Sequence, residues 1–212
     1  MRRTHSPRSR RAFLAAVTGA ATATAGCALL PEEQEPIEAS AERPAFLPDA
    51  AVSERGYAET LSTETTVTVS ATVDLSGDVQ ISNTREVIAD VFRRGYADDD
   101  GRRFGIVTAP AVAVIEQPEV VRDPIASVSA ARAVELATGA SVSSVSDWRS
   151  AATRTVLGTE AESETATATA DGADVELERA RVRAEGDAVT AIAIAPAGDE
   201  ADPPFGEVSR DA

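Results

Sequence analysis

The chain has 212 residues, with 35 Asp and Glu against 20 basic residues, all of them Arg, and a formal net charge of −15 at pH 7. Such an acidic chain repels phosphate groups, which excludes nucleic acid as a partner. A single Cys rules out an internal disulfide, and the length fits one domain with extensions. The charge is uneven, because residues 1–26 hold five Arg and no acid. From Cys27 onward, 15 Arg face 35 acids, a balance of −20.

Residues 1–26 have the features of an export signal. Arg10 and Arg11, followed closely by Phe13 and Leu14, resemble the twin-arginine (Tat) signal. The Ala-, Thr- and Gly-rich stretch behind them is shorter and less apolar than the roughly 20 apolar residues of a membrane-spanning helix. We therefore expect a Tat signal peptide over residues 1–26. The alternative is an ordinary basic N-terminus before a buried helix.

Small residues precede the single cysteine. Thr24, Ala25 and Gly26 before Cys27 resemble a lipobox, in which the cysteine is lipidated and becomes the new N-terminus. Two acyl chains hold a protein at a bilayer, because each buried CH₂ contributes about 0.8 kcal/mol. The sequence thus predicts a protein anchored through Cys27 to the outer face of the cell membrane. The alternative is a buried free thiol.

Proline and acidic residues mark two extensions of the chain. Residues 27–48 hold four Pro and five Glu, and both proline and like charge disfavour compaction. We expect an extended, disordered tether there. Residues 198–212 have the same character and predict a disordered acidic tail. Residues 49–197 between them form the predicted domain.

The first half of residues 49–197 contains both helix and strand patterns. Residues 48–56 predict a short helix that Gly56 ends. Apolar residues at every second position of 66–75 predict a strand, and residues 76–78 predict a hairpin turn. Residues 84–94 fit both a helix and a strand, with periodicity favouring the helix. Two further strands are predicted at 104–108 and 111–115, after a loop at 97–101.

The second half predicts one helix and a run of strands. The helix begins at Ser127 or Ser129 and runs to Ala137, with Gly139 after it. Consecutive strands on short turns form an antiparallel meander, and helices apart from them indicate the α+β class. We expect an antiparallel meander with one or two short helices packed on one face. Its last four strands are predicted at 152–157, 159–170, 175–182 and 188–195.

Several pieces of the chain carry a family resemblance. They are the Tat signal, the lipobox at Cys27, Ser53–Tyr57, Phe104–Val112, Thr155–Glu160 and the C-terminal hairpin. Together they resemble an uncharacterised family of haloarchaeal, Tat-exported lipoproteins with a domain of unknown function. The resemblance implies a strand over residues 84–94, and strand is our prediction there, although this chain lacks the family's usual Trp in that segment. The family has no established activity, so the resemblance transfers no functional residue beyond the signal.

Few side chains remain for catalysis. The only His is His5, inside the predicted signal, the only Cys is the predicted anchor, and Lys is absent. These counts exclude Ser-His-Asp and Cys-His catalysis, zinc and copper sites and Schiff bases, so no metal site and no cofactor is predicted. Asp98, Asp99 and Asp100 are oxygen ligands of the kind that Ca²⁺ or Mg²⁺ prefers. They lack the spacing of an EF-hand, and an acidic turn in solvent is the favoured interpretation.

The leading hypothesis is therefore a lipid-anchored, extracytoplasmic, non-enzymatic module that binds an unknown protein or a small apolar ligand, or serves the cell envelope. A sheet-lined pocket favours a ligand, and a flat apolar patch favours a protein partner. The rival hypothesis is a carboxylate-dependent hydrolase, which needs two converging buried carboxylates with a raised pKa. We interpret the acidity as adaptation to a saline exterior, since molar salt suppresses self-repulsion.

Overall fold

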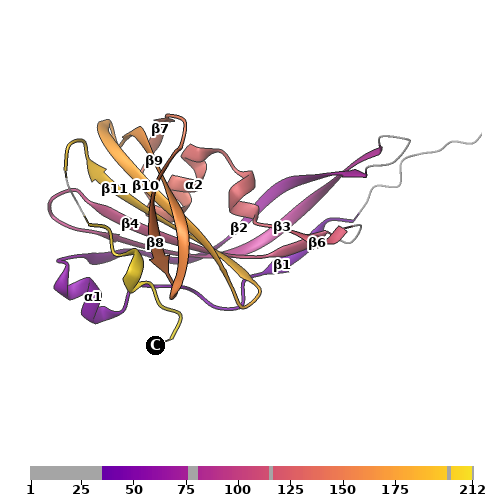
Figure 1. Cartoon of the computed structure of the whole chain (residues 1–212), viewed down its shortest axis with the longest axis horizontal. Helices are drawn as coiled ribbons and strands as arrows, with labels where there is room; N and C mark the ends of the chain where they lie inside the picture. Colours follow the sequence, from indigo (N-terminus) through magenta and orange to yellow (C-terminus); the bar gives the residue numbers. More distant parts are fainter. Residues whose placement is uncertain (1–34, 76–80, 115–116, 200–201, 212) are drawn as a thin grey trace, which may run out of the picture. The chain divides into compact units, whose positions relative to one another are not determined.

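A computed structural model describes residues 35–75, 81–114, 117–199 and 202–211. Within these residues the chain forms a nine-stranded sheet and a separate two-stranded ribbon, with α2 against the sheet (Figure 1). The elements are β1 (Ile37–Ser40), α1 (Asp49–Glu54), β2 (Ala58–Leu75), β3 (Ile81–Ala97), β4 (Arg103–Pro110), β5 (Val112–Val114), β6 (Gln117–Arg122), η1 (Pro124–Ser127), α2 (Ala130–Thr138), β7 (Val142–Val145), β8 (Arg149–Val156), β9 (Thr159–Ala170), β10 (Ala173–Ala184), β11 (Asp187–Pro196) and η2 (Phe205–Glu207).

The predicted run of four strands is confirmed as β8 to β11. The strands are joined by two-residue turns, and both residues of each turn have positive φ, as a type I′ turn requires. Glycine occupies the second position each time, which costs no side-chain clash. These turns fix the register that places alternate side chains on the two faces of the sheet. The turn residues are Leu157 and Gly158, Asp171 and Gly172, and Glu185 and Gly186.

The ambiguous segment 84–94 is a strand, as predicted. It lies within β3, which pairs along its whole length with β2 from Leu75↔Ile81 to Ala58↔Ala97. A segment this long is strand rather than helix because both of its edges find partners: β2 on one side, and β1 and β4 on the other. The predicted turn at residues 76–78 lies outside the described residues.

The prediction of a simple antiparallel meander was wrong. The sheet is mixed, because β1 pairs with β3 in parallel, from Ile37↔Val87 to Ser40↔Asp90. Its order also departs from the sequence, since β11 pairs with β4 and so joins the β2–β3–β4 and β8–β11 runs. Local periodicity carries no information about which distant strands become neighbours, and this pairing closes a long loop. The sheet is the dominant element, and α1 buries no residue.

The described parts of the two extensions are also ordered, which corrects the predicted disorder. Part of the expected tether forms β1, and Ala45 and Leu47 behind it are buried. In the expected tail, Phe205 and Val208 are buried. The two segments pair with each other through Phe46 and Ser209, whose backbone groups exchange two hydrogen bonds of 2.9 Å. The disorder was predicted from the proline and acidic residues of both segments. The apolar side chains of the same segments nevertheless pack into the core.

Two buried clusters lie on opposite faces of the sheet. On one face α2 packs against β3, β4, β7 and β11, and Val134 and Leu136 belong to the buried cluster there. Its ends match the prediction, since Ser129 caps its first turn and Gly139 ends it with φ 74°. The other face is covered by the N- and C-terminal segments, and its cluster is built around Phe104 and Phe205. This second face carries the candidate site.

Candidate functional site

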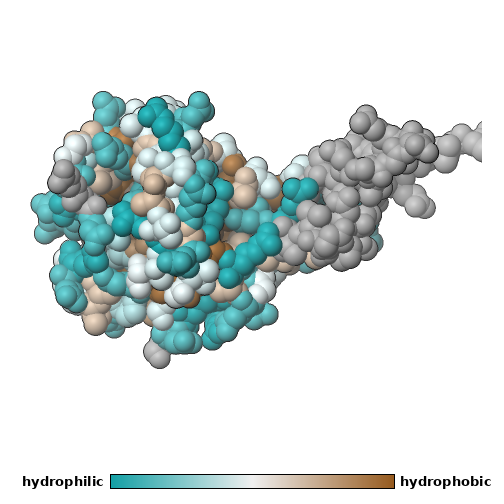
Figure 2. Space-filling view, in the orientation of Figure 1, coloured by the Kyte–Doolittle hydropathy of each residue, from teal (hydrophilic) through white to brown (hydrophobic). Residues whose placement is uncertain are grey.

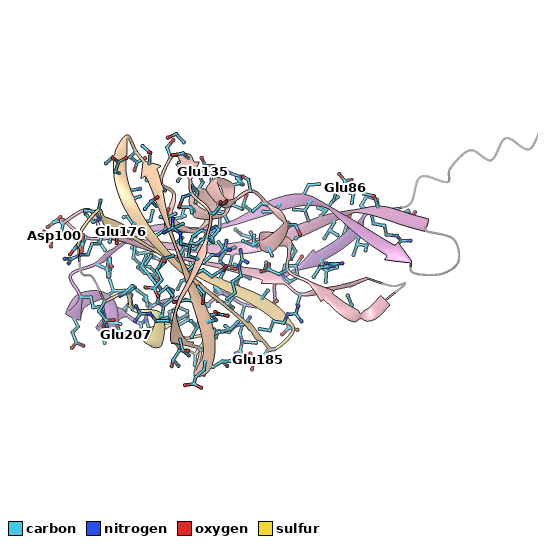
Figure 3. All side chains as sticks on the ribbon, turned by 45° about the horizontal axis from the view of Figure 1, so that its top comes forward. Glu86, Asp100, Glu135, Glu176, Glu185 and Glu207 are labelled. Atoms are coloured by element: carbon cyan, nitrogen blue, oxygen red, sulfur yellow. The ribbon has the colours of Figure 1, made fainter. Side chains whose placement is uncertain are left out.

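A cleft of about 310 Å³ opens over the face of the sheet that the terminal segments partly cover. Its floor is formed by β9, β10 and β11, and its far wall comes from residues near α1, the β3–β4 turn and the C-terminal segment. Figure 3 places Glu176 of this floor at the end of the molecule that also holds Asp100 of the β3–β4 turn. The predicted criterion for ligand binding, a sheet-lined concavity, is thus present.

Strand register assembles the floor. Arg149 of β8 pairs with Thr165 of β9, Thr165 with Glu178 of β10, and Glu178 with Ala193 of β11. This row crosses four strands, so its side chains point to one face. A second row lies two residues away on the same face of β9, β10 and β11, and consists of Thr167, Glu176 and Ala195. The small side chains of both rows leave the space, and the long charged ones border it.

The opposite wall carries an ion pair and a tyrosine. Arg102 donates from Nε and Nη2 to the two carboxylate oxygens of Asp199, over 2.6 and 3.1 Å. This hydrogen bond lowers the pKa of the Asp199 carboxyl. Tyr57 is half-buried beside them, and burial raises the pKa of its hydroxyl. Asp199 is therefore held ionised, which suits it to orient Arg102 and not to donate a proton.

Most charges of the cleft are matched within the protein. Glu178 accepts two hydrogen bonds from Arg154, of 2.7 and 2.9 Å, and one of 2.7 Å from the Ser163 hydroxyl. Among the described residues, the side chains of Arg149 and Glu176 form no hydrogen bond or ion pair, and both are exposed. One cation and one anion at the cleft therefore remain available to a ligand.

The sequence-predicted site residues lie elsewhere. Arg10, Arg11, Phe13, Leu14 and Cys27 are outside the described residues, so their roles stay predictions. In the described ranges no helix is long and apolar enough to cross a membrane.

The acidic turn at Asp98–Asp100 is organised by its own backbone. Asp98 Oδ1 accepts from the backbone N–H groups of Asp100 and Arg102, over 3.0 and 2.8 Å, and its side chain is 8% exposed. Asp99 and Asp100 are exposed. Over the part of the chain that the structure describes, no group of three acidic, His or Cys residues is arranged to hold a metal ion. The carboxylate of Asp98 thus shapes the loop that presents Arg102 to the cleft.

Sequence reasoning did not single out the cleft. The alternation in β9 and β10 could have placed Thr165 and Thr167 on one face and Glu176 and Glu178 beside them. No local signal, however, connects these strands with Tyr57, which lies more than a hundred residues earlier in the chain.

Comparison with known proteins gives a family without an activity. The model of DUF6517, a domain of unknown function, matches residues 44–210, so the chain belongs to this family. No curated protein and no solved structure is significantly similar to the chain. The match begins and ends inside the two segments that we expected to be disordered, in agreement with their packing against the sheet.

Proposed function

We propose, from this membership and from the cleft, that the chain is a non-enzymatic binding module held at the outer face of the membrane. Its cleft takes a small ligand that has an apolar body and a charged end. The observation that carries the proposal is the pair of unmatched charges, Arg149 and Glu176, at the border of a cleft floored by small side chains. The volume lies near the lower end of the range of small-molecule sites, about 300–1,000 Å³.

The lining supports a ligand of mixed character. Ala193, Ala195 and Pro203 offer apolar surface, and Thr165 and Thr167 border it with hydroxyl groups. A charged end then binds Arg149 or Glu176 without displacing an internal partner. A protein partner is supported less well on the face in Figure 2, where apolar residues are scattered between hydrophilic ones.

The carboxylates of the cleft favour binding over hydrolysis. Hydrolysis by two carboxylates needs one of them to keep its proton near neutral pH, through a raised pKa. In the cleft, Arg102 lowers the pKa of Asp199, and Arg154 engages Glu178 from a distance of 2.7 Å. Glu176 is exposed. Asp199 is therefore held ionised and does not supply the proton that such a pair needs.

The membrane anchor is the second part of the proposal. Tat export through Arg10 and Arg11 and lipidation of Cys27 would hold so acidic a chain at a surface that otherwise repels it. In native cells, Cys27→Ser should move the protein from the membrane fraction to the soluble fraction, with Ser62→Ala, at an exposed position of β2, as the control. A membrane fraction unchanged by Cys27→Ser would contradict the anchor and leave the cleft proposal untouched.

Two amphipathic probes of opposite charge test the cleft. Saturation-transfer NMR should detect octanoate, whose carboxylate binds Arg149, and octylammonium, whose amine binds Glu176. Arg149→Gln should weaken octanoate alone, and Glu176→Gln should weaken octylammonium alone, by about tenfold for one charge-assisted contact. Thr167→Phe should fill the cleft and weaken both probes.

Matched exposed residues serve as controls for these variants. Arg132→Gln on α2 and Glu64→Gln on β2 make the same charge changes far from the lining and should alter neither probe. Equal binding by the wild type, Arg149→Gln, Glu176→Gln and Thr167→Phe would show that the probes bind elsewhere and would overturn the cleft as the site.

A further inference from the structure

Three arginines follow one another on the face of β10 that is opposite to the cleft. Alternation places Arg179, Arg181 and Arg183 on the same face as Val175 and Leu177, which belong to the core beneath α2. The strand thus changes from apolar to cationic along one face. Such a row is unusual in a chain with a net charge of −15, because carboxylates are abundant enough to match every arginine.

The first arginine of the row is matched within the protein. Arg179 donates from Nε to Glu164 over 2.8 Å, and its guanidinium lies 3.9 Å from the ring centre of Trp148. Arg181, two residues on, differs. Its Nε is buried and has no hydrogen-bond partner, and no carboxylate lies within 4 Å of its guanidinium among the described residues.

A buried hydroxyl lies opposite this unmatched group. Arg181 pairs in register with Thr190 of β11, so the two side chains are direct cross-strand neighbours on one face. Thr190 is 1% exposed, and within the described ranges its Oγ1 has no hydrogen-bond partner either. Two adjacent donors without an acceptor are costly in a folded protein, because buried polar groups nearly always find partners. An acceptor from outside the chain would satisfy both.

Two acids and a second arginine act on the charge of Arg181. Asp123, at the start of η1, and Glu164 are the acids whose charge reaches Arg181, and Arg179 opposes them. Glu164 is already bound to Arg179, and Asp123 Oδ1 accepts from the backbone N–H of Ile125 over 2.8 Å. Burial lowers the pKa of Arg181 and raises that of Asp123, because loss of water disfavours the charged form of each group. Arg181 as a whole is partly exposed, so its side chain borders solvent although its Nε is buried.

We propose that Arg181 and Thr190 form a binding site for a small inorganic oxyanion, on the face of the sheet opposite to the cleft. The guanidinium supplies charge and the Nε–H donor, and the threonine hydroxyl supplies a second donor from the neighbouring strand. Asp123 borders the site and repels the anion, so it limits the affinity. The site is independent of the proposed cleft, since no residue is shared between them.

Titration of the full chain with inorganic phosphate tests the site. Ionic strength is held constant with sodium gluconate, and binding is followed by calorimetry and ³¹P NMR. Arg181→Gln should weaken binding about tenfold or more, and Thr190→Val, which keeps the shape of the side chain, should weaken it about fivefold. Asp123→Asn should tighten binding, because it removes a nearby negative charge and keeps an oxygen that accepts from Ile125.

The Asp123→Asn variant separates this proposal from a simpler one, in which Asp123 is the partner of Arg181 through a bridging water. In that case Asp123→Asn would weaken binding or destabilise the fold, and the proposal would be overturned. Equal phosphate binding by the wild type, Arg181→Gln and the exposed control Arg132→Gln would also overturn it, as would the absence of saturable binding. If Arg181→Gln fails to fold, Thr190→Val and Asp123→Asn still test the site. Circular dichroism shows whether these two variants are folded.

Discussion

The ring of Phe205 lies edge-on against the ring of Phe104, with 5.4 Å between their centres and an angle of 76° between their planes. Phe104 is on β4 in the middle of the sheet, and Phe205 is near the C-terminus, in a segment that composition alone marks as a disordered tail. Both rings are buried. The C-terminal segment is therefore part of the core on the face that carries the cleft.

Removing the Phe205 ring should destabilise the protein strongly. Phe205→Ala should lower the free energy of unfolding by about 3–5 kcal/mol, because it leaves a cavity against Phe104. Urea unfolding measures the change. Phe92→Ala removes the same atoms from a partly exposed position on β3 and should cost less. Equal losses in the two variants would mean that the tail does not pack as described.

A buried ion pair fastens both terminal segments to the β10–β11 hairpin. Arg210, with 5% of its side chain exposed, binds the carboxylate of Asp187, which is 1% exposed, and also donates to the carbonyl oxygens of Arg43 and Ala184 over 2.7 and 2.9 Å. Asp187 accepts in addition from the backbone N–H of Glu42. One pair of side chains thus connects three separate parts of the chain.

Breaking this pair should be costly, because it leaves the other charge buried without a partner. Asp187→Asn should lower the free energy of unfolding by about 3–5 kcal/mol. The matched control is Glu135→Gln, which breaks the partly exposed pair with Arg132 and should cost about 0.5 kcal/mol or less. Thermal and urea unfolding of both variants give the comparison. A similar small loss of stability in each would contradict the role of the Arg210–Asp187 pair.

The helix α2 approaches the sheet at a glycine. A Cβ on Gly105 would lie 2.3 Å from the backbone carbonyl of Ala137, so an alanine there would push the helix away. Gly105→Ala should cost about 1–3 kcal/mol of stability. Gly206→Ala is the control, because a Cβ at that position meets no atom within 4 Å. Hydrogen exchange at α2 should rise in Gly105→Ala alone, and unchanged exchange would argue against this contact.

The pair of Glu164 and Arg179 should make stability depend on pH. The hydrogen bond from Arg179 lowers the pKa of Glu164 below its usual 4.5. A carboxyl with a lowered pKa in the folded state stabilises that state above its ordinary pKa, and the contribution disappears as the pH falls through the lowered value. Glu164→Gln lacks this contribution at every pH. The wild type should therefore exceed the variant in stability at pH 7, and the difference should close in acid.

Urea unfolding along a series of pH values below neutrality checks this prediction. Other acids bound to arginine, such as Asp199, titrate in the wild type and the variant alike and cancel in the difference. Glu160→Gln, an exposed position on the same face of β9, should differ from the wild type by the same small amount throughout. A difference for Glu164→Gln that is independent of pH would contradict the assignment.

Local elements were predictable because their signals are local. Ser129 and Gly139 mark the ends of α2, and the β8–β11 strands follow from alternation between glycine turns. Local signals do not show which distant strands or side chains become neighbours. The short apolar alternation of β1 gives no indication that β3 is its parallel neighbour, and Phe205 gives none that Phe104 is its contact.

The candidate site likewise has one part that the sequence predicts and one part that it does not. Its floor follows from period-two alternation, which puts Thr165 and Glu178 on one face once the register is known. Its wall depends on Arg102 and Tyr57, which reach the cleft through the folding of distant segments. Asp98 is of the residue type that binds cations, but its carboxylate accepts hydrogen bonds from two backbone N–H groups. Binding sites built across segments are therefore accessible only from the structure.

The surplus of acids should make the fold more stable in concentrated salt. Arginines are already surrounded: Arg102 has Asp98 and Asp100 at 3.7 Å and Asp199 at 2.6 Å. From Cys27 onward 35 acids face 15 arginines, so repulsion remains after pairing. The screening length falls to about 3 Å in 1 M salt, which suppresses that repulsion. The Tm should therefore rise with NaCl, and replacing Glu64 and Glu86, which are exposed, with Gln should flatten the rise. Differential scanning calorimetry at low and molar NaCl decides this, since an equal Tm at both would refute the interpretation of the charge as adaptation to salt.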